Sequence, residues 1–432
     1  MTTEPAPRTG EGGPSTRAWV LHPDIPRDGR QRAPELALEE AVSLARALPG
    51  LEVCGSSVVR LPRPHPGLLF GKGKLEELAT LAEDQHLDLV LVDGPVSPVQ
   101  QRNLEKKLGL KLLDRTSLIL EIFSDRAATR EGVLQVEMAA LSYQRTRLVR
   151  AWTHLERQRG GLGFVGGPGE TQIEADRRAI DEQLVRLRRQ LAKVVKTREL
   201  HRAARAKVPF PIVALVGYTN AGKSTLFNRL TGAEVMVKDM LFATLDPTMR
   251  RIRLPEGGPE VILSDTVGFI SDLPTELVAA FRATLEEVTS ADLICHVRDI
   301  SHPETDAQSS DVHAILESLG VQDSTPQIEV WNKVDRLEPE ARDALHNRAA
   351  RNAPVQMISA ITGDGIDALC EALVGAITGP TQTSTLQLGF EAGRKRAWLF
   401  DKGLVEREEP GEDGYRLTVR WSASQRSQFE AL

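Results

Sequence analysis

A glycine-rich loop ending in lysine and serine is the part of this chain best suited to chemistry. It comprises Gly217, Tyr218, Thr219, Asn220, Ala221, Gly222, Lys223 and Ser224, followed by Thr225. The apolar residues 212–216 before it predict a buried strand, and residues 225–230 predict a helix. Such a turn points backbone N–H groups and a helix N-terminus at a polyphosphate, while the lysine reaches the terminal phosphates and the serine hydroxyl ligates Mg²⁺. The loop predicts nucleoside triphosphate binding without indicating the base.

A second motif downstream suits the γ-phosphate and the metal. Asp265, Thr266, Val267 and Gly268 follow the apolar run 261–263. A carboxylate at Asp265 can hold Mg²⁺ through water, and the Gly268 N–H can bond a γ-phosphate. Between the loop and this motif, residues 241–248 are the natural place for a switch segment whose threonine completes the Mg²⁺ coordination. Thr244 is the first choice for that ligand and Thr248 the second.

Two further motifs select guanine. Asn332, Lys333, Val334 and Asp335 follow the apolar residues 328–331. The Asp335 carboxylate can accept two N–H bonds that guanine offers and adenine does not, so a site built for those donors rejects adenine. Ser359 and Ala360 follow residues 355–358, and their backbone can support the guanine carbonyl. Motifs in this order, each after a predicted strand, predict an α/β domain with a mostly parallel sheet that hydrolyses GTP to GDP and phosphate.

One departure from the usual pattern concerns catalysis. Some GTPases place a water-orienting glutamine directly after the glycine of this second motif. Phe269 occupies that position, and its ring can neither accept a proton nor orient water. We therefore expect slow unaided hydrolysis and leave the water-activating group unassigned. Asn220 is a candidate K⁺ ligand beside the phosphates, and the alternative is that it only stabilises the loop turn.

Composition sets the limits for the rest of the chain. It has 432 residues, a formal net charge of −6 and three scattered cysteines. These features predict two or three domains in a reducing compartment. No apolar run approaches the roughly 20 residues of a membrane span, and the N-terminus has no signal-like apolar segment. We expect a cytoplasmic monomer without a membrane span.

The pattern along the chain predicts five segments. Residues 1–15 are rich in Pro, Gly, Thr and Glu and predict a disordered tail. Alternating strand and helix signals predict an N-terminal α/β domain over 16–127. Residues 128–207 predict two antiparallel helices with a glycine-rich tip. The second helix is indicated by an apolar stripe at Ile180, Leu184, Leu187, Leu191 and Val194. Residues 208–379 form the GTPase domain. After a linker at 379–384, residues 385–432 predict a small α+β module.

The helical hairpin is basic. Residues 145–207 contain 16 Lys or Arg against 7 Asp or Glu, a net charge of +9 in a chain that is negative overall. A charge run of this kind can be a solvated helix face or an arm for phosphate backbones. The RNA-binding interpretation points to the tip, where glycine backbone can approach RNA closely. Its candidate contacts are Arg157, Arg159, Gly160, Gly161, Gly163 and Phe164, although Phe164 could equally pack inside the hairpin.

Taken together, these residues resemble the HflX family of translation-associated GTPases. The resemblance extends over most of the chain and is carried by residues 71–74, 97–105, 114–116, 130–132, 134–137, 160–178, 241–248 and 265–274. It implies a GTPase that binds the large ribosomal subunit and its rRNA, with the N-terminal domain and the hairpin near the peptidyl-transferase region. It also implies that the GTP form dissociates or rescues stalled or resting ribosomes, notably under stress, and that the ribosome stimulates hydrolysis.

Two alternatives stay open at this point. The chain could be a nucleotide-gated RNA-binding or ribosome-assembly factor whose hydrolysis is incidental. It could also be an RNA-dependent NTPase or helicase, although the motif ending in Asp335 argues against strict use of ATP.

Overall fold

The computed structural model describes most of the chain in two compact units. The described residues are 15–26, 32–158, 168–205, 210–233, 241–242, 244–245, 247–255, 258–273, 286–321, 325–351, 355–379, 381–401, 403–411, 414–422, 426 and 429–430. The first unit combines Met1–Lys207 with Met236–Asp246 and Val267–Leu285. The second combines Val208–Val235, Pro247–Thr266 and Glu286–Leu432. The expected tail, residues 1–15, lies outside the described residues except for Ser15.

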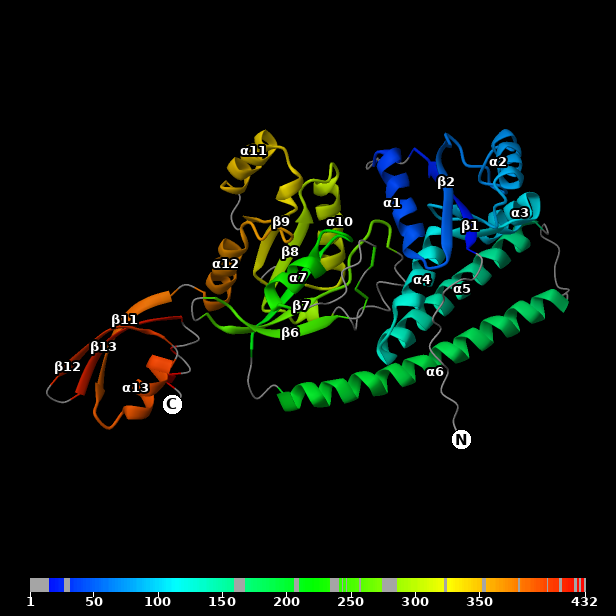
Figure 1. The fold of residues 1–432 in the computed structure, drawn as a ribbon. Helices are drawn as coiled ribbons and strands as arrows, with labels where there is room; N and C mark the ends of the chain where they lie inside the picture. Colours follow the sequence, from blue (N-terminus) through cyan, green and yellow to red (C-terminus); the bar gives the residue numbers. More distant parts are fainter. Residues whose placement is uncertain are drawn as a thin grey trace. The chain divides into compact units, whose positions relative to one another are not determined.

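The first unit begins with a four-stranded parallel sheet, shown in blue and cyan in Figure 1. The strand order is β2-β1-β3-β4, for β1 (Thr16–Asp24), β2 (Leu51–Arg60), β3 (Leu89–Val92) and β4 (Lys111–Asp114). Helices alternate with these strands: α1 (Pro34–Ala47), α2 (Lys72–Asp84), α3 (Pro98–Leu108) and α4 (Arg115–Arg126). All four residues of β3 are buried, as expected for a strand covered on both faces. The predicted N-terminal α/β fold is confirmed.

Ser97 fixes the start of α3 through a capping box. Its Oγ accepts a bond of 3.2 Å from the Gln100 N–H, and the Gln100 carboxamide accepts one of 2.9 Å from the Ser97 N–H. Each of these bonds satisfies a donor that a helix start leaves without a partner. The helix ends at Gly109, whose φ of +68° is a left-handed conformation that glycine adopts at little cost.

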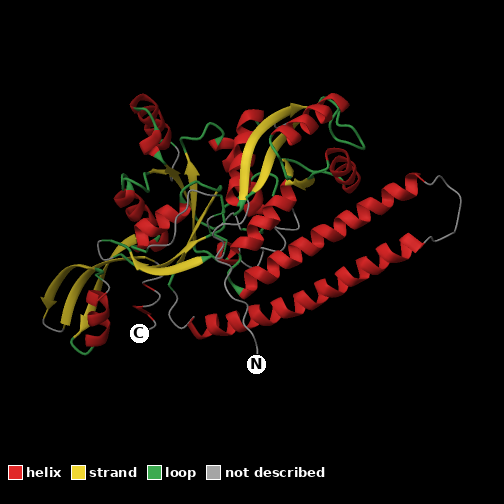
Figure 2. Cartoon of the chain, turned by 45° about the vertical axis from the view of Figure 1, so that its right-hand side comes forward, coloured by secondary structure: helices red, strands yellow, loops and turns green. Residues whose placement is uncertain are grey.

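Two long helices, α5 (Arg130–Gln158) and α6 (Pro168–Arg205), follow the sheet. They lie side by side in both Figure 1 and Figure 2. Leu184 and Leu187 of the predicted apolar stripe are buried, and the other stripe residues, Ile180, Leu191 and Val194, are partly buried. The predicted pair of helices is confirmed. Among the described residues, no helix is both long and apolar enough to cross a membrane.

Asp114 fastens α5 to the sheet at the junction of β4 and α4. Its carboxylate caps α4 by accepting a 2.8 Å bond from the Ser117 N–H. It also accepts a bond from the Tyr143 hydroxyl and forms a 2.8 Å ion pair with Arg147, both on α5. Burial, together with Asp114, raises the pKa of Tyr143 to about 12, so the phenol remains a donor.

The second unit contains a six-stranded sheet in the order β10-β9-β8-β5-β7-β6. Its strands are β5 (Ile212–Gly217), β6 (Thr248–Arg253), β7 (Glu260–Asp265), β8 (Leu293–Asp299), β9 (Gln327–Asn332) and β10 (Val355–Met357). All pairs are parallel except that of the edge strand β6. The connecting elements are α7 (Lys223–Thr231), α9 (Glu286–Thr289), α10 (Thr305–Ser318), the 3-10 turn η1 (Val334–Arg336), α11 (Pro339–Ala349) and α12 (Ile366–Thr378). The predicted P-loop α/β domain is confirmed.

A three-stranded antiparallel sheet ends the second unit. It has the order β11-β13-β12, for β11 (Thr381–Gly389), β12 (Val405–Gly411) and β13 (Gly414–Ser422), with α13 (Gly393–Asp401) beside it. Leu417, Val419 and Trp421 alternate along β13 and are buried, as predicted for one face of an α+β module. The prediction of a linker at 379–384 is wrong for most of these residues, because β11 already starts at Thr381 and pairs there with Ser422.

Candidate nucleotide site

The phosphate loop connects β5 to α7, and two of its glycines are required by the space around them. Gly217 has φ +153°, and a Cβ there would lie 2.1 Å from the Val297 carbonyl oxygen. Gly222 has φ +96°, and a Cβ there would lie 2.2 Å from Nδ2 of Asn332. A side chain at position 217 would collide with backbone, and one at position 222 would displace the Asn332 carboxamide and strain a left-handed backbone. The loop is therefore held close to β8 and β9, with its N–H groups at the start of α7.

Lys223 is buried at the start of α7. Its Nζ donates to the carbonyls of Gly217 at 3.1 Å and Tyr218 at 2.9 Å. Burial lowers the pKa of Lys223 to about 8, with Asp265 opposing the shift and Lys333 adding to it. An anion close to this amine would restore its preference for the charged form, as a polyphosphate does.

Ser224 and Asp265 provide oxygen ligands of the type that Mg²⁺ prefers. The Ser224 hydroxyl donates a 2.7 Å bond to Oδ2 of Asp265, which ends β7 and is fully buried. The neighbouring Thr266 is fixed by a 2.6 Å bond from its hydroxyl to the Leu215 carbonyl. A hydroxyl and a carboxylate in contact fit a small hard cation that keeps several waters. Ser224 directly and Asp265 through water would hold Mg²⁺, which supplies positive charge to the β- and γ-phosphates.

Asn332 joins the guanine motif to the phosphate loop. Its Nδ2 donates to the Ala221 carbonyl at 2.8 Å, and its Oδ1 accepts from the Ala360 N–H at 2.9 Å. The Ser359 hydroxyl accepts a 3.1 Å bond from the Thr362 N–H and stabilises the turn that carries Ala360. The structure therefore brings together the phosphate loop, the motif that begins at Asn332 and the turn at Ala360. Asn332 and Ala221 are 111 residues apart in the chain.

Lys333 and Asp335 complete the guanine motif. Lys333 has φ +67° and forms a 2.7 Å ion pair with Asp299 at the end of β8. Asp335 is exposed in η1. An exposed carboxylate beside a buried motif is available to accept donors from a base.

The expected switch residues belong to the other compact unit. Thr244 and Gly268 lie in segments that cluster with the N-terminal sheet, and the Phe269 side chain is buried there. Thr248, the second choice for the Mg²⁺ ligand, begins β6 opposite Asp265. Asn220 is exposed in the phosphate loop with φ +58°. Asparagine tolerates this left-handed conformation better than most residues, which agrees with a role in the loop turn.

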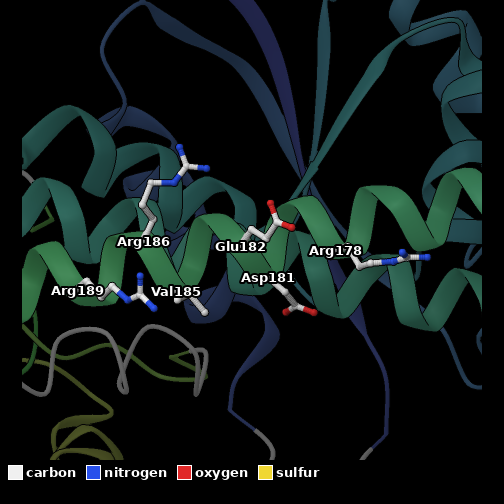
Figure 3. Close-up of a pocket in the computed structure, with 6 residues that line it drawn as sticks. All are labelled: Arg178, Asp181, Glu182, Val185, Arg186 and Arg189. Atoms are coloured by element: carbon white, nitrogen blue, oxygen red, sulfur yellow. The ribbon is translucent and has the colours of Figure 1, made fainter.

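The structure gives no side-chain position for the proposed RNA contacts. Arg157 falls in the last turn of α5, where side chains are not described, and Arg159, Gly160, Gly161, Gly163 and Phe164 lie outside the described residues. A surface hollow on α6 has mixed charge, as Figure 3 shows, and is lined by Arg178, Asp181, Glu182, Val185, Arg186 and Arg189. Asp181 there pairs with Arg145 of α5 at 2.8 Å. Part of the positive charge of the hairpin is thus neutralised by an ion pair between the two helices.

Sequence reasoning missed two residues near these motifs. Asp299 orients Lys333 through their ion pair. Its position in the sequence, a carboxylate at the end of an apolar run, could have indicated a role at the site. Arg229 donates a 3.1 Å bond to the Ala360 carbonyl from the last turn of α7, and nothing in the sequence distinguishes it from a solvated helix residue.

A phosphate loop, a buried aspartate at the end of the neighbouring strand β7 and a guanine motif on one mostly parallel sheet define a P-loop GTPase, an enzyme that binds GTP and hydrolyses it. Four family models match the chain: GTP-binding GTPase N-terminal (35–124), GTP-binding GTPase Middle Region (126–205), 50S ribosome-binding GTPase (212–333) and HflX C-terminal domain (344–431). The chain belongs to the HflX family of GTPases, as its curated relatives also establish.

Two of these relatives match most of the chain. GTPase HflX of Magnetococcus marinus is 49% identical over 93% of this chain and 90% of its own length. GTPase HflX of Escherichia coli is 46% identical over 81% of this chain and 82% of its own. Among solved structures, a GTP-binding protein of Sulfolobus solfataricus in complex with GDP is 22% identical, covers 84% of this chain and 99% of its own, and has a TM-score of 0.45.

Proposed function

We propose that this GTPase binds the large ribosomal subunit and its rRNA as a monomer in the cytoplasm, and that its GTP form dissociates or rescues stalled or resting ribosomes, notably under stress. Hydrolysis is stimulated by the ribosome and releases the protein. Membership of the HflX family supports the proposal, because the model matching residues 212–333 describes a 50S ribosome-binding GTPase. The absence of a water-orienting glutamine at Phe269 agrees with a need for an external activator.

The observation that carries the proposal is the charge of α6. Over residues 174–196, where the structure describes side chains of α6, the cationic residues are exposed; they are Arg177, Arg178, Arg186, Arg188, Arg189, Lys193 and Lys196. Arg177 and Arg178 have side chains 52% and 73% exposed, although they lie within 4 Å of carboxylates of their own helix. Exposed ion pairs of this kind contribute little, so Arg177 and Arg178 remain available to phosphates. Exposed cations along a helix suit the phosphate backbone of a folded RNA.

We propose the following assignments at the nucleotide site. Gly217 to Thr225 of the loop and the Gly268 N–H contact the phosphates. Ser224, Asp265 and Thr244 hold Mg²⁺. Asp335 selects guanine, with Asn332, Lys333, Ser359 and Ala360 shaping its pocket, and Asn220 is a candidate K⁺ ligand. The tip residues named above contact rRNA.

Sedimentation with purified subunits tests the ribosomal part. We expect the protein to sediment with large subunits in a non-hydrolysable GTP analogue and much less in GDP, and to split intact ribosomes only in the analogue. Steady-state GTP turnover should rise strongly when large subunits are added. Binding without stimulation would favour an RNA-binding or assembly factor with incidental hydrolysis, and equal competition by ATP would favour an RNA-dependent NTPase.

A further inference from the structure

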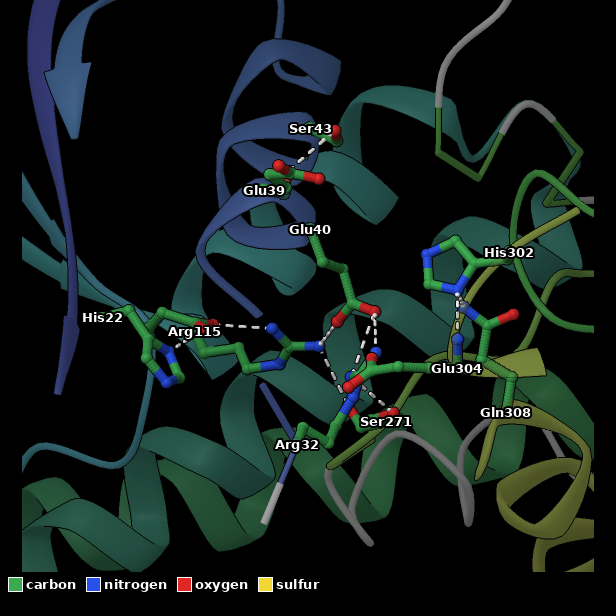
Figure 4. Close-up of polar contacts among 11 residues, drawn as sticks. His22, Arg32, Glu39, Glu40, Ser43, Arg115, Ser271, His302, Glu304 and Gln308 are labelled. Carbon is green, nitrogen blue, oxygen red and sulfur yellow. Dashed lines mark hydrogen bonds and ion pairs between the residues drawn. The ribbon is translucent and has the colours of Figure 1, made fainter. Parts of the chain in front are cut away.

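Arg115, the first residue of α4, reaches a segment 156 residues further along the chain. Its guanidinium donates to Oδ1 of Asp93 and Oε1 of Glu40, both at 2.6 Å, and to the Ser271 main-chain carbonyl at 3.0 Å. Figure 4 shows the Arg115 guanidinium beside Glu40, which comes from α1, and near Ser271. Burial alone would lower the pKa of Arg115, but Asp93 and Glu40 raise it above its ordinary value, so the group is a permanent cation. Arg115 therefore binds the main-chain carbonyl oxygen of residue 271, which is present whatever side chain stands at that position.

The Ser271 side chain is held as well. Nη1 of Arg32 donates a 2.9 Å bond to the Ser271 hydroxyl, and both terminal nitrogens of Arg32 lie 3.2 Å from Oε2 of Glu40. Glu40 thus accepts from Arg115 with one oxygen and from Arg32 with the other. Charge-assisted bonds of this geometry are shorter and stronger than neutral ones, so Ser271 is fixed on both sides.

The same helix, α4, holds the earlier switch segment through an aromatic contact. The rings of Phe123 and Phe242 have centroids 4.6 Å apart and cross at 80°. Both rings are buried, and Phe242 has a left-handed φ of +56°. A bulky residue keeps that conformation only where its surroundings fix it. Phe242 lies two residues before Thr244, and Ser271 lies three residues after Gly268.

We propose that Arg115 and Phe123 are positioning residues for the GTP switch: α4 holds the segments that carry Thr244 and Gly268 and couples their arrangement to the N-terminal domain. The inference rests on the proposed contacts of Thr244 and Gly268 with Mg²⁺ and the γ-phosphate. Thr244 and Gly268 are two and three residues from these anchors and therefore stay within about 7 to 11 Å of them. A rearrangement of either segment on GTP binding would then be transmitted to α4, whereas GDP lacks the γ-phosphate that Gly268 contacts.

Coupling of this kind is measured as an affinity ratio. For Arg115→Gln and for Phe123→Leu, we expect the ratio of GTP-analogue affinity to GDP affinity to change at least about fivefold, the lower bound of typical allosteric coupling. GDP affinity itself should stay within twofold. A residue that only stabilises the fold would change both affinities together or neither. Phe123→Leu keeps an apolar side chain in the core and remains informative if loss of Arg115 between two buried carboxylates prevents folding.

Arg147→Gln is the matched control, because Arg147 is a largely buried arginine that pairs with Asp114 in the same compact unit. It should leave the ratio unchanged. The inference is overturned if the ratio stays unchanged in both Phe123→Leu and Arg115→Gln, or if Arg147→Gln shifts it equally. Thr244→Ala separates this failure from that of the proposed switch. If Thr244→Ala weakens analogue binding while the α4 variants do not alter the ratio, the coupling is wrong and the role of Thr244 stands. If Thr244→Ala does not change analogue binding, the proposed role of Thr244 in holding Mg²⁺ is wrong.

Discussion

The Asn332 carboxamide donates a 2.8 Å hydrogen bond to the main-chain carbonyl of Ala221, in the phosphate loop. Its oxygen meanwhile accepts from the Ala360 N–H, so one side chain fixes the base motif and the phosphate loop to each other. The two ends of a nucleotide are therefore recognised by parts of the chain that cannot move independently.

Replacing Asn332 with Ala should weaken both nucleotide binding and stability. It leaves the buried Ala360 N–H and the Ala221 carbonyl without their partner, a loss of about 1–3 kcal/mol in unfolding free energy. Thermal unfolding and titration with GDP measure the two effects. Asn103→Ala removes a comparable bond, 2.9 Å to the Gly67 carbonyl, and should lower stability without changing GDP affinity. Equal GDP affinities for both variants would contradict the bridging role.

Replacing Asp335 with Asn should relax the preference for guanine. A charged acceptor of two N–H bonds becomes an amide that offers one acceptor, and bonds to charged groups contribute roughly 1.5–3 kcal/mol. We expect GTP affinity to fall at least about tenfold and xanthosine triphosphate to compete better. Asp343→Asn, which changes an exposed aspartate of α11, should leave competition among GTP, ATP and xanthosine triphosphate unaltered. Unchanged GTP affinity in Asp335→Asn would rule out its contact with the base.

Lys223 should make nucleotide binding pH-dependent. Its pKa is about 8 in the free protein, below the ordinary 10.5, and a bound polyphosphate raises it, so binding takes up a proton near pH 8 and weakens as the pH rises further. The unfolded chain holds more protons between pH 8 and 10.5, so this group makes the free protein more stable as pH rises through that range. Calorimetry in two buffers of different ionisation enthalpy measures the uptake. It should vanish in Lys223→Met.

The exposed arginines of α6 should determine the salt dependence of ribosome binding. Changing Arg186, Arg188 and Arg189 together to Gln removes up to three phosphate contacts, so the slope of log affinity against log salt should fall by about 2–3. The triple change at Arg407, Arg416 and Arg420 removes the same charge from exposed positions of β12 and β13 and serves as the control. Equal loss in the two variants would indicate attraction by total charge and not by the helix.

Asn220 can be tested through the monovalent cation. If it ligates K⁺, GTP turnover should be faster in K⁺ than in Na⁺, and Asn220→Gly should abolish the difference while keeping the left-handed turn at φ +58°. Equal GTP turnover of the parent protein in K⁺ and Na⁺ would rule out K⁺ ligation by Asn220, and stabilisation of the loop turn would be its remaining role.

Much of this arrangement could be predicted from local sequence. The apolar runs before the loop and before Asp335 are short, buried and bounded by polar motifs, and each became a strand of the parallel sheet. The stripe from Ile180 to Val194 similarly predicted the packed face of α6. At Thr381 the same reasoning failed, because threonine, serine and glutamine alternate there without an apolar face and their pairing with β13 comes from tertiary context.

Other features could not be predicted because their partners are remote in the chain. Arg115 gives no local sign of burial, since arginine is usually exposed and its partners lie 22, 75 and 156 residues away. The antiparallel edge strand β6 also carries three arginines and reads as a polar loop. Strand order in a sheet and charge pairing across it depend on topology, which local periodicity does not contain.

Asp114 and Arg115 are consecutive residues, yet the first anchors α5 and the second anchors the chain after Gly268. The 29 residues of α5 extend about 43 Å from one end to the other. Asp114 holds α5 at Arg147, 11 residues before its last residue, Gln158, so a rotation of about 5° at Arg147 would carry that end through an arc of about 1.4 Å. An adjustment of a fraction of an ångström beside Arg115 would thus become a shift of more than an ångström where the helix leads to the glycine-rich tip.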